Sequence, residues 1–145
     1  MAQATKRISI VLVDDDLAAA EGVVALIQAQ PGYHVFAAAA EIDTVLRTVR
    51  DNKPELVILN LRQEGDDSLA LVGALHGETP ETRIILMGLE SSQTDVASYV
   101  RAGVSGFVIA GASFEVFLHT IQSVSNGIRV LPAGLTPSLF RQLKK

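Results

Sequence analysis

Short apolar runs alternate with longer amphipathic stretches along the chain. Five runs rich in β-branched and other apolar residues predict strands buried on both faces, at residues 8–13, 34–38, 56–59, 83–87 and 106–109. Each run is followed by a stretch in which apolar residues recur every three or four positions. These stretches predict helices at residues 17–30, 41–50, 68–76, 94–102 and 114–124. The pattern is therefore a strand followed by a helix, five times.

Five strand–helix units predict an α/β fold, a (βα)5 doubly wound architecture. Almost wholly apolar strands joined by short connections are typical of a parallel sheet that is covered by helices on both faces. Residues at the ends of the first predicted helix agree with this interpretation. Asp16 is placed to cap its start, and Pro31-Gly32 stops it.

The C-terminal part of the chain differs in composition from the rest. After residue 125 the sequence becomes linker-like, and Thr136 is placed to cap a last helix. A length of 145 residues agrees with a single domain. We therefore expect a domain over residues 1–125, followed over residues 126–145 by a linker and a helix that lead toward a DNA-binding effector domain.

Composition excludes several classes of site. The chain has no cysteine, which excludes a disulfide scaffold, a thiolate metal site and a catalytic thiol. A formal charge of −4 and 5% aromatic residues disfavour direct binding of nucleic acid. No apolar run approaches the length of a membrane span, so we expect a cytoplasmic protein without membrane contact. The three histidines, which show no ligand spacing, are His34, His76 and His119.

Candidate chemistry lies where the predicted strands end, because ligands bind at the carboxyl edge of a doubly wound sheet. An Asp-Asp-Asp run at residues 14–16 follows the first strand, and Asn60 follows the third. Gly88 follows the fourth strand and Ala110 follows the fifth. Two adjacent carboxylates at a strand end are suitable ligands for Mg²⁺, so a weak metal site is one interpretation of the acidic run.

Four segments carry a resemblance to a known family. They are V-L-V-D-D-D-L-A-A-A-E-G, K-P-E-L-V-I-L-N-L, R-I-I-L-M-G and R-A-G-V-S-G-F-V-I-A, and they occur in order at the family's spacing. Over nearly the whole chain, they resemble the receiver domain of bacterial two-component response regulators. The segments R-A-G-V-S-G-F and N-G-I-R-V-L-P are most similar to the NarL/FixJ subgroup. The resemblance implies a five-stranded parallel sheet with the flavodoxin-like order 2-1-3-4-5.

The resemblance also implies a degenerate phosphoryl-acceptor site. In the family an acidic pair binds Mg²⁺, which Asp14 and Asp15 match, and an aspartate after the third strand accepts the phosphoryl group, where this chain has Asn60. A Ser or Thr after the fourth strand is replaced by Gly88, and a Lys after the fifth by Ala110. The amide of Asn60 is a neutral, poor nucleophile, so we expect no aspartyl phosphate.

Each of these residues also has a purely structural interpretation. Asp14 and Asp15 either cap the following helix or keep a residual divalent-ion site. The Asn60 amide either satisfies the loop backbone or locks the loop in one signalling state. Phe107, at the family's aromatic switch position, is either core packing or a moving switch. The aspartates at residues 66–67 are interpreted as a solvated acidic loop rather than as substitute acceptors.

These observations lead to one principal hypothesis. We expect a pseudo-receiver that acts without phosphorylation as the signalling and dimerisation module of a transcriptional response regulator, and not as an enzyme. DNA would be contacted only through an effector domain outside this chain. The exposed faces of the fourth and fifth helices, or of the first and fifth, are candidate surfaces for a homodimer. A partner protein or small ligand would regulate it by binding one conformation more tightly than another.

Two alternatives stay open. The first is a stand-alone adaptor that binds a kinase or another regulator and has no DNA-binding part. The second is a Mg²⁺-dependent phosphohydrolase of the haloacid-dehalogenase kind, in which Asp14 is the nucleophile and Asp16 the general acid. That family also places a Ser or Thr and a Lys at later strand ends, and the chain lacks both where they are expected.

Overall fold

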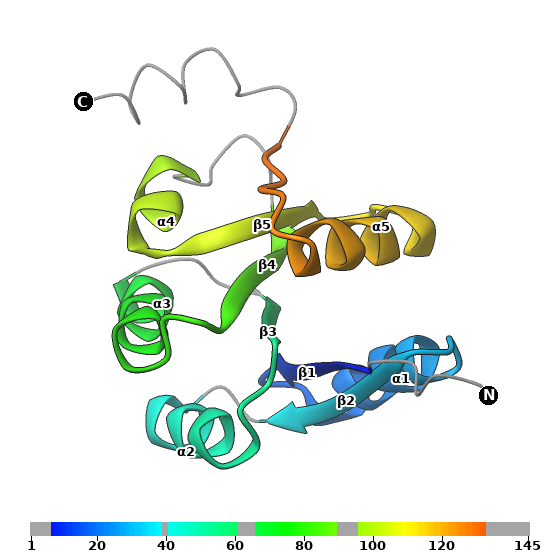
Figure 1. Ribbon diagram of the computed structural model, residues 1–145, viewed down its shortest axis with the longest axis horizontal. Coiled ribbons are helices and arrows are strands. Elements are labelled where there is room, and N and C mark those ends of the chain that lie inside the picture. Colours follow the sequence, from blue (N-terminus) through cyan, green and yellow to red (C-terminus); the bar gives the residue numbers. More distant parts are fainter. Residues whose placement is uncertain (1–6, 39–40, 61–65, 90–95, 133–145) are drawn as a thin grey trace, which may run out of the picture.

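The five predicted strands form one sheet in the computed structural model of the protein, which describes residues 7–38, 41–60, 66–89 and 96–132. In chain order the elements are β1 (Ile8–Val13), α1 (Leu17–Gln28), β2 (Tyr33–Ala38), α2 (Ile42–Asn52), β3 (Leu56–Asn60), α3 (Asp66–Glu78), β4 (Arg83–Leu89), α4 (Val96–Ala102), β5 (Val104–Ile109) and α5 (Phe114–Ser125). All neighbouring strands pair in parallel, in the order β2-β1-β3-β4-β5 (Figure 1). The predicted doubly wound fold and its strand order are confirmed.

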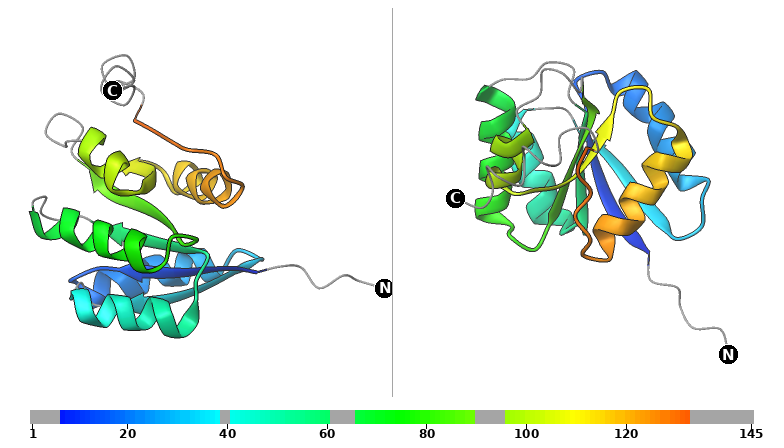
Figure 2. Two further views of the ribbon diagram at one scale, coloured as in Figure 1. Left: turned by 60° about the vertical axis from the view of Figure 1, so that its left-hand side comes forward. Right: turned by 90° about the horizontal axis from the view of Figure 1, so that it is seen from above.

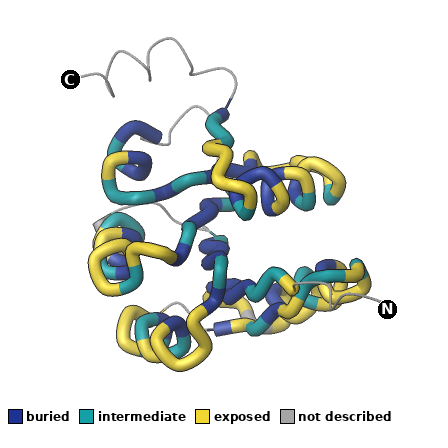
Figure 3. The backbone as a smooth tube through the Cα atoms, viewed as in Figure 1, coloured by how far each residue is buried: buried dark blue, intermediate teal, exposed yellow. Residues whose placement is uncertain are grey.

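Helices cover both faces of the sheet (Figure 2). α1 and α5 pack on one face, toward which Ile10 and Leu12 of β1 point. α2, α3 and α4 pack on the other face, toward which Val11 and Val13 point. Because successive side chains of a strand point to opposite faces, an apolar strand such as β1 contributes to both layers of the core. Buried residues accordingly concentrate in the strands, and exposed residues on the outer sides of the helices (Figure 3).

Capping residues mark the starts of two helices. The Ala19 N–H donates to Asp16 Oδ1 at 3.1 Å, which confirms Asp16 as the N-cap of α1. Ser113 caps α5 in the same way. α1 ends at Gln28 rather than at residue 30, because the chain already turns there toward Gly32, whose φ is 94°. Among the described residues, no helix has both the length and the apolar character needed to cross a membrane.

Two predicted boundaries near the carboxyl edge of the sheet are wrong. α3 begins at Asp66, so residues 66–67 form its first turn and not a loop. β4 runs two residues further than predicted, to Leu89, so Gly88 lies within the strand and not after it. Pairing with β5 produces this extension, and pairing between distant segments leaves no signal in a local apolar run. Residues 94–95 of the predicted fourth helix lie outside the described residues.

The stretch after α5 runs along the free edge of β5. Val130 forms a parallel bridge with Gly106. Its N–H donates to the Ser105 carbonyl at 3.0 Å, and the Phe107 N–H donates to the Val130 carbonyl at 3.1 Å. The predicted helix after Thr136 lies outside the described residues, and the division between domain and linker after residue 125 stays a prediction.

Candidate functional site

The register of β1 and β3 brings Asp14 and Asn60 together. Val13 pairs with Leu59 in these adjacent parallel strands, and Asp14 and Asn60 are the next residues along each chain segment. The Asn60 side-chain amide donates through Nδ2 to Asp14 Oδ2 at 2.8 Å. The reverse orientation would place two oxygen atoms at this distance without a proton between them, so the amide must present its nitrogen.

The carboxylate of Asp14 is completely buried, with 0% of its surface exposed. Its Oδ1 accepts the Asp16 N–H at 2.9 Å, while Oδ2 accepts the Asn60 amide. Its own N–H donates to the Ala38 carbonyl at 3.1 Å, which continues the pairing of β1 with β2. Burying a carboxylate without donors is strongly unfavourable. The neutral donors on both oxygens therefore stabilise this residue in the fold.

The three consecutive aspartates occupy three different environments. Asp14 is the buried acceptor described above. Asp15 is exposed. Asp16 is also exposed and caps α1. The acidic run therefore does not present three carboxylates to one point.

Gly88 lies in a bulge of β4. Met87 pairs with Val108 and Leu89 pairs with Ile109, so the register between β4 and β5 skips Gly88. The φ of Gly88 is 81°, in the left-handed region that favours glycine. A Ser or Thr at this position would require a strained backbone or another backbone path. The backbone conformation at residue 88 therefore favours glycine over a residue that carries a hydroxyl group.

Ala110 and Phe107 lie at and near the end of β5. Ala110 is exposed, and its methyl group carries no charge. Phe107 is only 4% exposed and belongs to the same buried cluster as Val96 and Val100 of α4. These surroundings support the interpretation of Phe107 as core packing.

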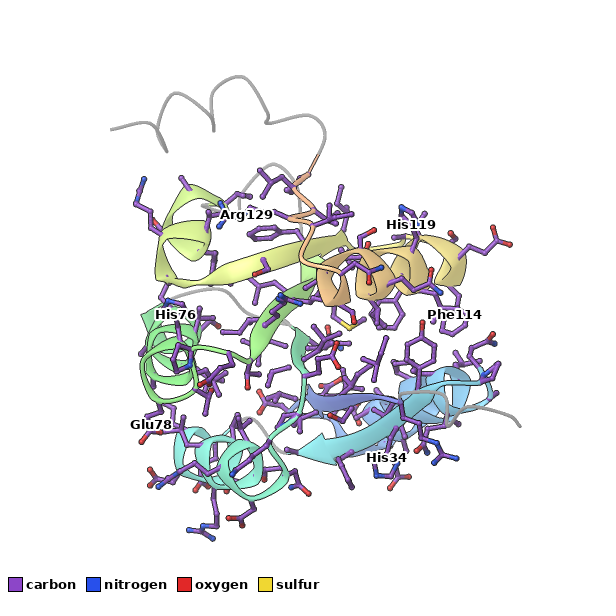
Figure 4. The ribbon with its side chains drawn as sticks, viewed as in Figure 1. His34, His76, Glu78, Phe114, His119 and Arg129 are labelled. Atoms are coloured by element: carbon purple, nitrogen blue, oxygen red, sulfur yellow. The ribbon has the colours of Figure 1, made fainter. Side chains whose placement is uncertain are left out.

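The donor set does not fit a Mg²⁺ site. Mg²⁺ requires oxygen ligands, but Asn60 presents its amide nitrogen to Asp14 where a cation would contact the carboxylate. Within the described ranges, no three His, Cys, Asp or Glu side chains lie close enough to hold a metal ion. The histidines lie on separate elements, as Figure 4 shows: His34 on β2, His76 on α3 and His119 on α5.

Comparison with known proteins identifies the family. Residues 10–122 match the response regulator receiver domain, which is more than half of the chain. The chain belongs to this family. The nitrate/nitrite response regulator protein NarL of Escherichia coli K12 is 25% identical over 136 residues, which cover 94% of this chain and 63% of NarL. The transcriptional regulatory protein LnrK of Bacillus subtilis is 20% identical over 138 residues, which cover 95% of this chain and 63% of LnrK.

A solved structure shows the same fold. It is a LuxR-family two-component response regulator from Aurantimonas sp. SI85-9A1, with a TM-score of 0.79 and 23% sequence identity. The similarity covers 97% of this chain and 100% of that chain. The chain spans about 63% of the length of the curated relatives named above.

The sequence predicted that Asp14 and Asn60 lie at one edge of the sheet, but it missed two geometric features of this edge. It did not show that Asn60 donates to the buried oxygen of Asp14 rather than to the loop backbone. It also did not predict the bulge. The glycine at residue 88, where the family resemblance implies a Ser or Thr, is a signal from which the bulge could have been inferred. Both features depend on the register between strands that are distant in sequence.

We predict that Asn60→Asp destabilises the receiver by about 1–3 kcal/mol in the absence of divalent cations. The substitution replaces a donor 2.8 Å from Asp14 Oδ2 with a second carboxylate, and the like charges repel. Urea unfolding at neutral pH measures the change. Asp15→Asn is the control, because Asp15 is exposed and its change should stay within about 0.5 kcal/mol. Equal effects of the two substitutions would contradict the stabilising role of the hydrogen bond.

We predict that Gly88→Thr destabilises the receiver by about 1–3 kcal/mol, and that Gly88→Asn costs less. The reason is the φ of 81° at Gly88, a conformation that Asn adopts more readily than a β-branched residue. Midpoints of urea unfolding for the two variants provide the comparison. If Thr were tolerated as well as Asn, the backbone conformation would not be what favours glycine here.

Proposed function

We propose that this receiver works without phosphorylation, as the signalling and dimerisation module of a transcriptional response regulator. The observation that carries the proposal is the hydrogen bond from Asn60 Nδ2 to Asp14 Oδ2, at 2.8 Å. It supplies the buried carboxylate with a neutral partner from within the chain. This hydrogen bond supports a folded arrangement of the site in which no phosphoryl group takes part.

Three positions that the family resemblance assigns to phosphoryl transfer carry residues without the required groups. An aspartyl phosphate forms when a carboxylate oxygen attacks phosphorus, and the Asn60 amide is a poor nucleophile. Gly88 carries no hydroxyl, and Ala110 has no ammonium to stabilise charge on the transferring oxygens. The neighbouring carboxylate of Asp14 is completely buried and accepts hydrogen bonds at both oxygens, so it does not substitute as an acceptor.

The relatives indicate the setting of the proposed function. LnrK is named a transcriptional regulatory protein and NarL a nitrate/nitrite response regulator protein. By analogy, this receiver serves a cytoplasmic transcription regulator, in which a separate effector domain contacts DNA. The net charge of −4 agrees with a receiver that does not itself bind DNA. A partner protein or small ligand regulates it through unequal affinity for its conformations.

The two alternatives have less support. In the phosphohydrolase hypothesis Asp16 is the general acid, but its Oδ1 accepts the Ala19 N–H as a helix cap. Asp14, the nucleophile in that hypothesis, has no exposed surface. A stand-alone adaptor differs from the principal proposal only in what the receiver is attached to, and no contact among the described residues favours it.

The α1 side of the molecule is the surface that best fits a homodimer. α1 contains one charged residue, Glu21, and exposes Leu26 by 54%. Val116, on α5 of the same layer, is 51% exposed. On the opposite side, residues 128–132 already cover the edge of β5, which reduces the surface available between α4 and α5. Because α5 belongs to both candidate faces, the low charge of α1 and the exposed Leu26 are what favour the face of the first and fifth helices.

We predict that incubation with acetyl phosphate and Mg²⁺ adds no phosphoryl group to the chain. Intact-mass spectrometry measures the adduct, and a receiver that retains the acceptor aspartate serves as the reagent control. The phosphoryl mimic beryllium fluoride should also leave the amide spectrum unchanged, because the site lacks both the acceptor carboxylate and the ammonium. A stoichiometric adduct on this chain would refute phosphorylation independence.

We predict that the chain is a dimer at micromolar concentration and that Leu26→Glu makes it a monomer. The reason is that a charge placed on the apolar face of α1 would have to be desolvated on association. Sedimentation velocity measures the mass in solution. Ile42→Glu is the matched control, since Ile42 is 38% exposed on α2, on the other side of the sheet. A dimer that survives Leu26→Glu but not Ile42→Glu would place the interface elsewhere.

A further inference from the structure

The free edge of β5 is an interaction surface on which the chain's own residues 128–132 lie. β5 is the last strand in the sheet order, so one of its sides has no neighbouring strand from the five-stranded sheet. Val130 pairs there, through its N–H to Ser105 and through its carbonyl to the N–H of Phe107. An open strand edge readily pairs with other chains, and this contact blocks it. We call residues 128–132 the edge segment.

The side chains of the edge segment alternate like those of a strand. Val130 packs against the core cluster on the face of α1 and α5, and Leu131 packs against the cluster on the opposite face. Arg129 is exposed, and Ile128 has 57% of its surface exposed (Figure 4). Val130 and Leu131 therefore contact the two core clusters, while the side chains of the two residues before them are exposed.

Because α5 packs closely on β5, the chain that leaves α5 lies next to the free edge of β5. A Cβ atom on Gly106 would lie 2.6 Å from Val124 Cγ2, so only glycine lets the end of α5 approach the strand this closely. Gly127, with a φ of 87°, then reverses the chain. The Ile128 N–H donates to the Ser123 carbonyl at 2.9 Å and directs the edge segment back along β5. Figure 1 shows this path from α5 past β5.

The crossover through α5 has the opposite hand to the other crossovers of the sheet. From β1 to β2 the chain moves toward the β2 edge of the sheet, and the connecting helix α1 lies on the face that α1 and α5 cover (the first face). From β2 to β5 it moves toward the β5 edge, and α2, α3 and α4 lie on the opposite face (the second face). These four crossovers share one hand. The step from β5 to Val130 continues toward the second edge, but α5 lies on the first face. About 98% of such crossovers are right-handed, so this pairing is of the disfavoured kind.

The attachment of the edge segment is weak as well as unusual. Along β5 the segment forms one bridge with two backbone hydrogen bonds, and the side chains of Val130 and Leu131 are only partly buried. The central strands, by comparison, pair on both sides and are almost fully buried. Regions with few buried contacts open at lower free energy than the core.

We propose that the edge segment is a latch, which opens and closes on β5 while the rest of the receiver stays folded, and so sets where the chain beyond Pro132 leaves the domain. The occupant of the β5 edge in the closed state is this chain itself. The proposal rests on the proposed function, since a receiver without phosphorylation needs another conformational step to transmit a signal.

The latch is linked to the α4 side of the receiver. Leu131 packs against the cluster that contains Phe107 of β5 together with Val96 and Val100 of α4. The backbone of Phe107 also donates to Val130. A partner that displaces α4 would therefore change the surface that holds the latch closed. The proposed link between α4 and the edge segment therefore runs through the backbone of Phe107 and does not require rotation of its ring.

Amide hydrogen exchange of the full chain, followed by NMR, tests the latch. The amides of Phe107 and Val130 should exchange together, and at least about tenfold faster than those of Leu12 and Ile58 in the central strands. Val130→Pro removes the donor to Ser105 and should accelerate exchange at Phe107 about tenfold more. Arg129→Pro is the matched control, because Arg129 is exposed and its N–H donates to no other described residue.

A second pair of variants gives the same test without proline. Leu131→Ala should accelerate exchange at Phe107 and Val130, while Ile128→Ala, at an exposed position, should not. The latch is refuted if Phe107 exchanges only at the rate of the central strands, or if Val130→Pro and Leu131→Ala leave it unchanged. These outcomes do not involve phosphorylation. An adduct from acetyl phosphate would instead refute the proposed function and leave the latch result intact.

Discussion

The hydrogen bond between the Asn60 amide and the buried carboxylate of Asp14 is the interaction on which the candidate site depends. A carboxylate with no exposed surface must receive donors from its surroundings, or its burial opposes folding. Here the donors are an amide from the neighbouring strand and a backbone N–H from the start of α1. Both are neutral and belong to the chain. Each oxygen of the buried carboxylate therefore accepts a hydrogen bond from within the chain.

Two other residues at the carboxyl edge of the sheet, Gly88 and Ala110, also differ from those that the family resemblance implies. The bulge at Gly88 places glycine in a left-handed conformation at the strand end, and Ala110 leaves an uncharged surface after β5. The strand order and register of the sheet depend on apolar strand residues such as Ile58 and Ile85. These residues are buried in the core on the face that α1 and α5 cover. The apolar strands therefore keep the receiver fold while the residues at the strand ends differ from those the family resemblance implies.

The free side of β5 shows a second constraint. A sheet built from right-handed crossovers ends with an open edge, and the chain leaving α5 closes it by one bridge at Val130. The contact joins β5 to the residues that follow α5. The latch proposed above rests on this pairing, which involves fewer hydrogen bonds than the pairing of the central strands.

Much of the fold followed from local pattern alone. Alternating apolar runs and amphipathic stretches determined the five strand–helix units, and Asp16 marked the start of α1 correctly, because cap and helix periodicity are short-range properties. The end of β4 and the start of α3 were placed wrongly, since strand pairing and helix entry depend on distant contacts. The proximity of Asp14 and Asn60 also followed from the strand ends, whereas Gly88 lies within β4 and not after it. The orientation of the Asn60 amide, the φ of Gly88 and the bridge at Val130 were decided only by tertiary structure, because each depends on which strands become neighbours and in which register.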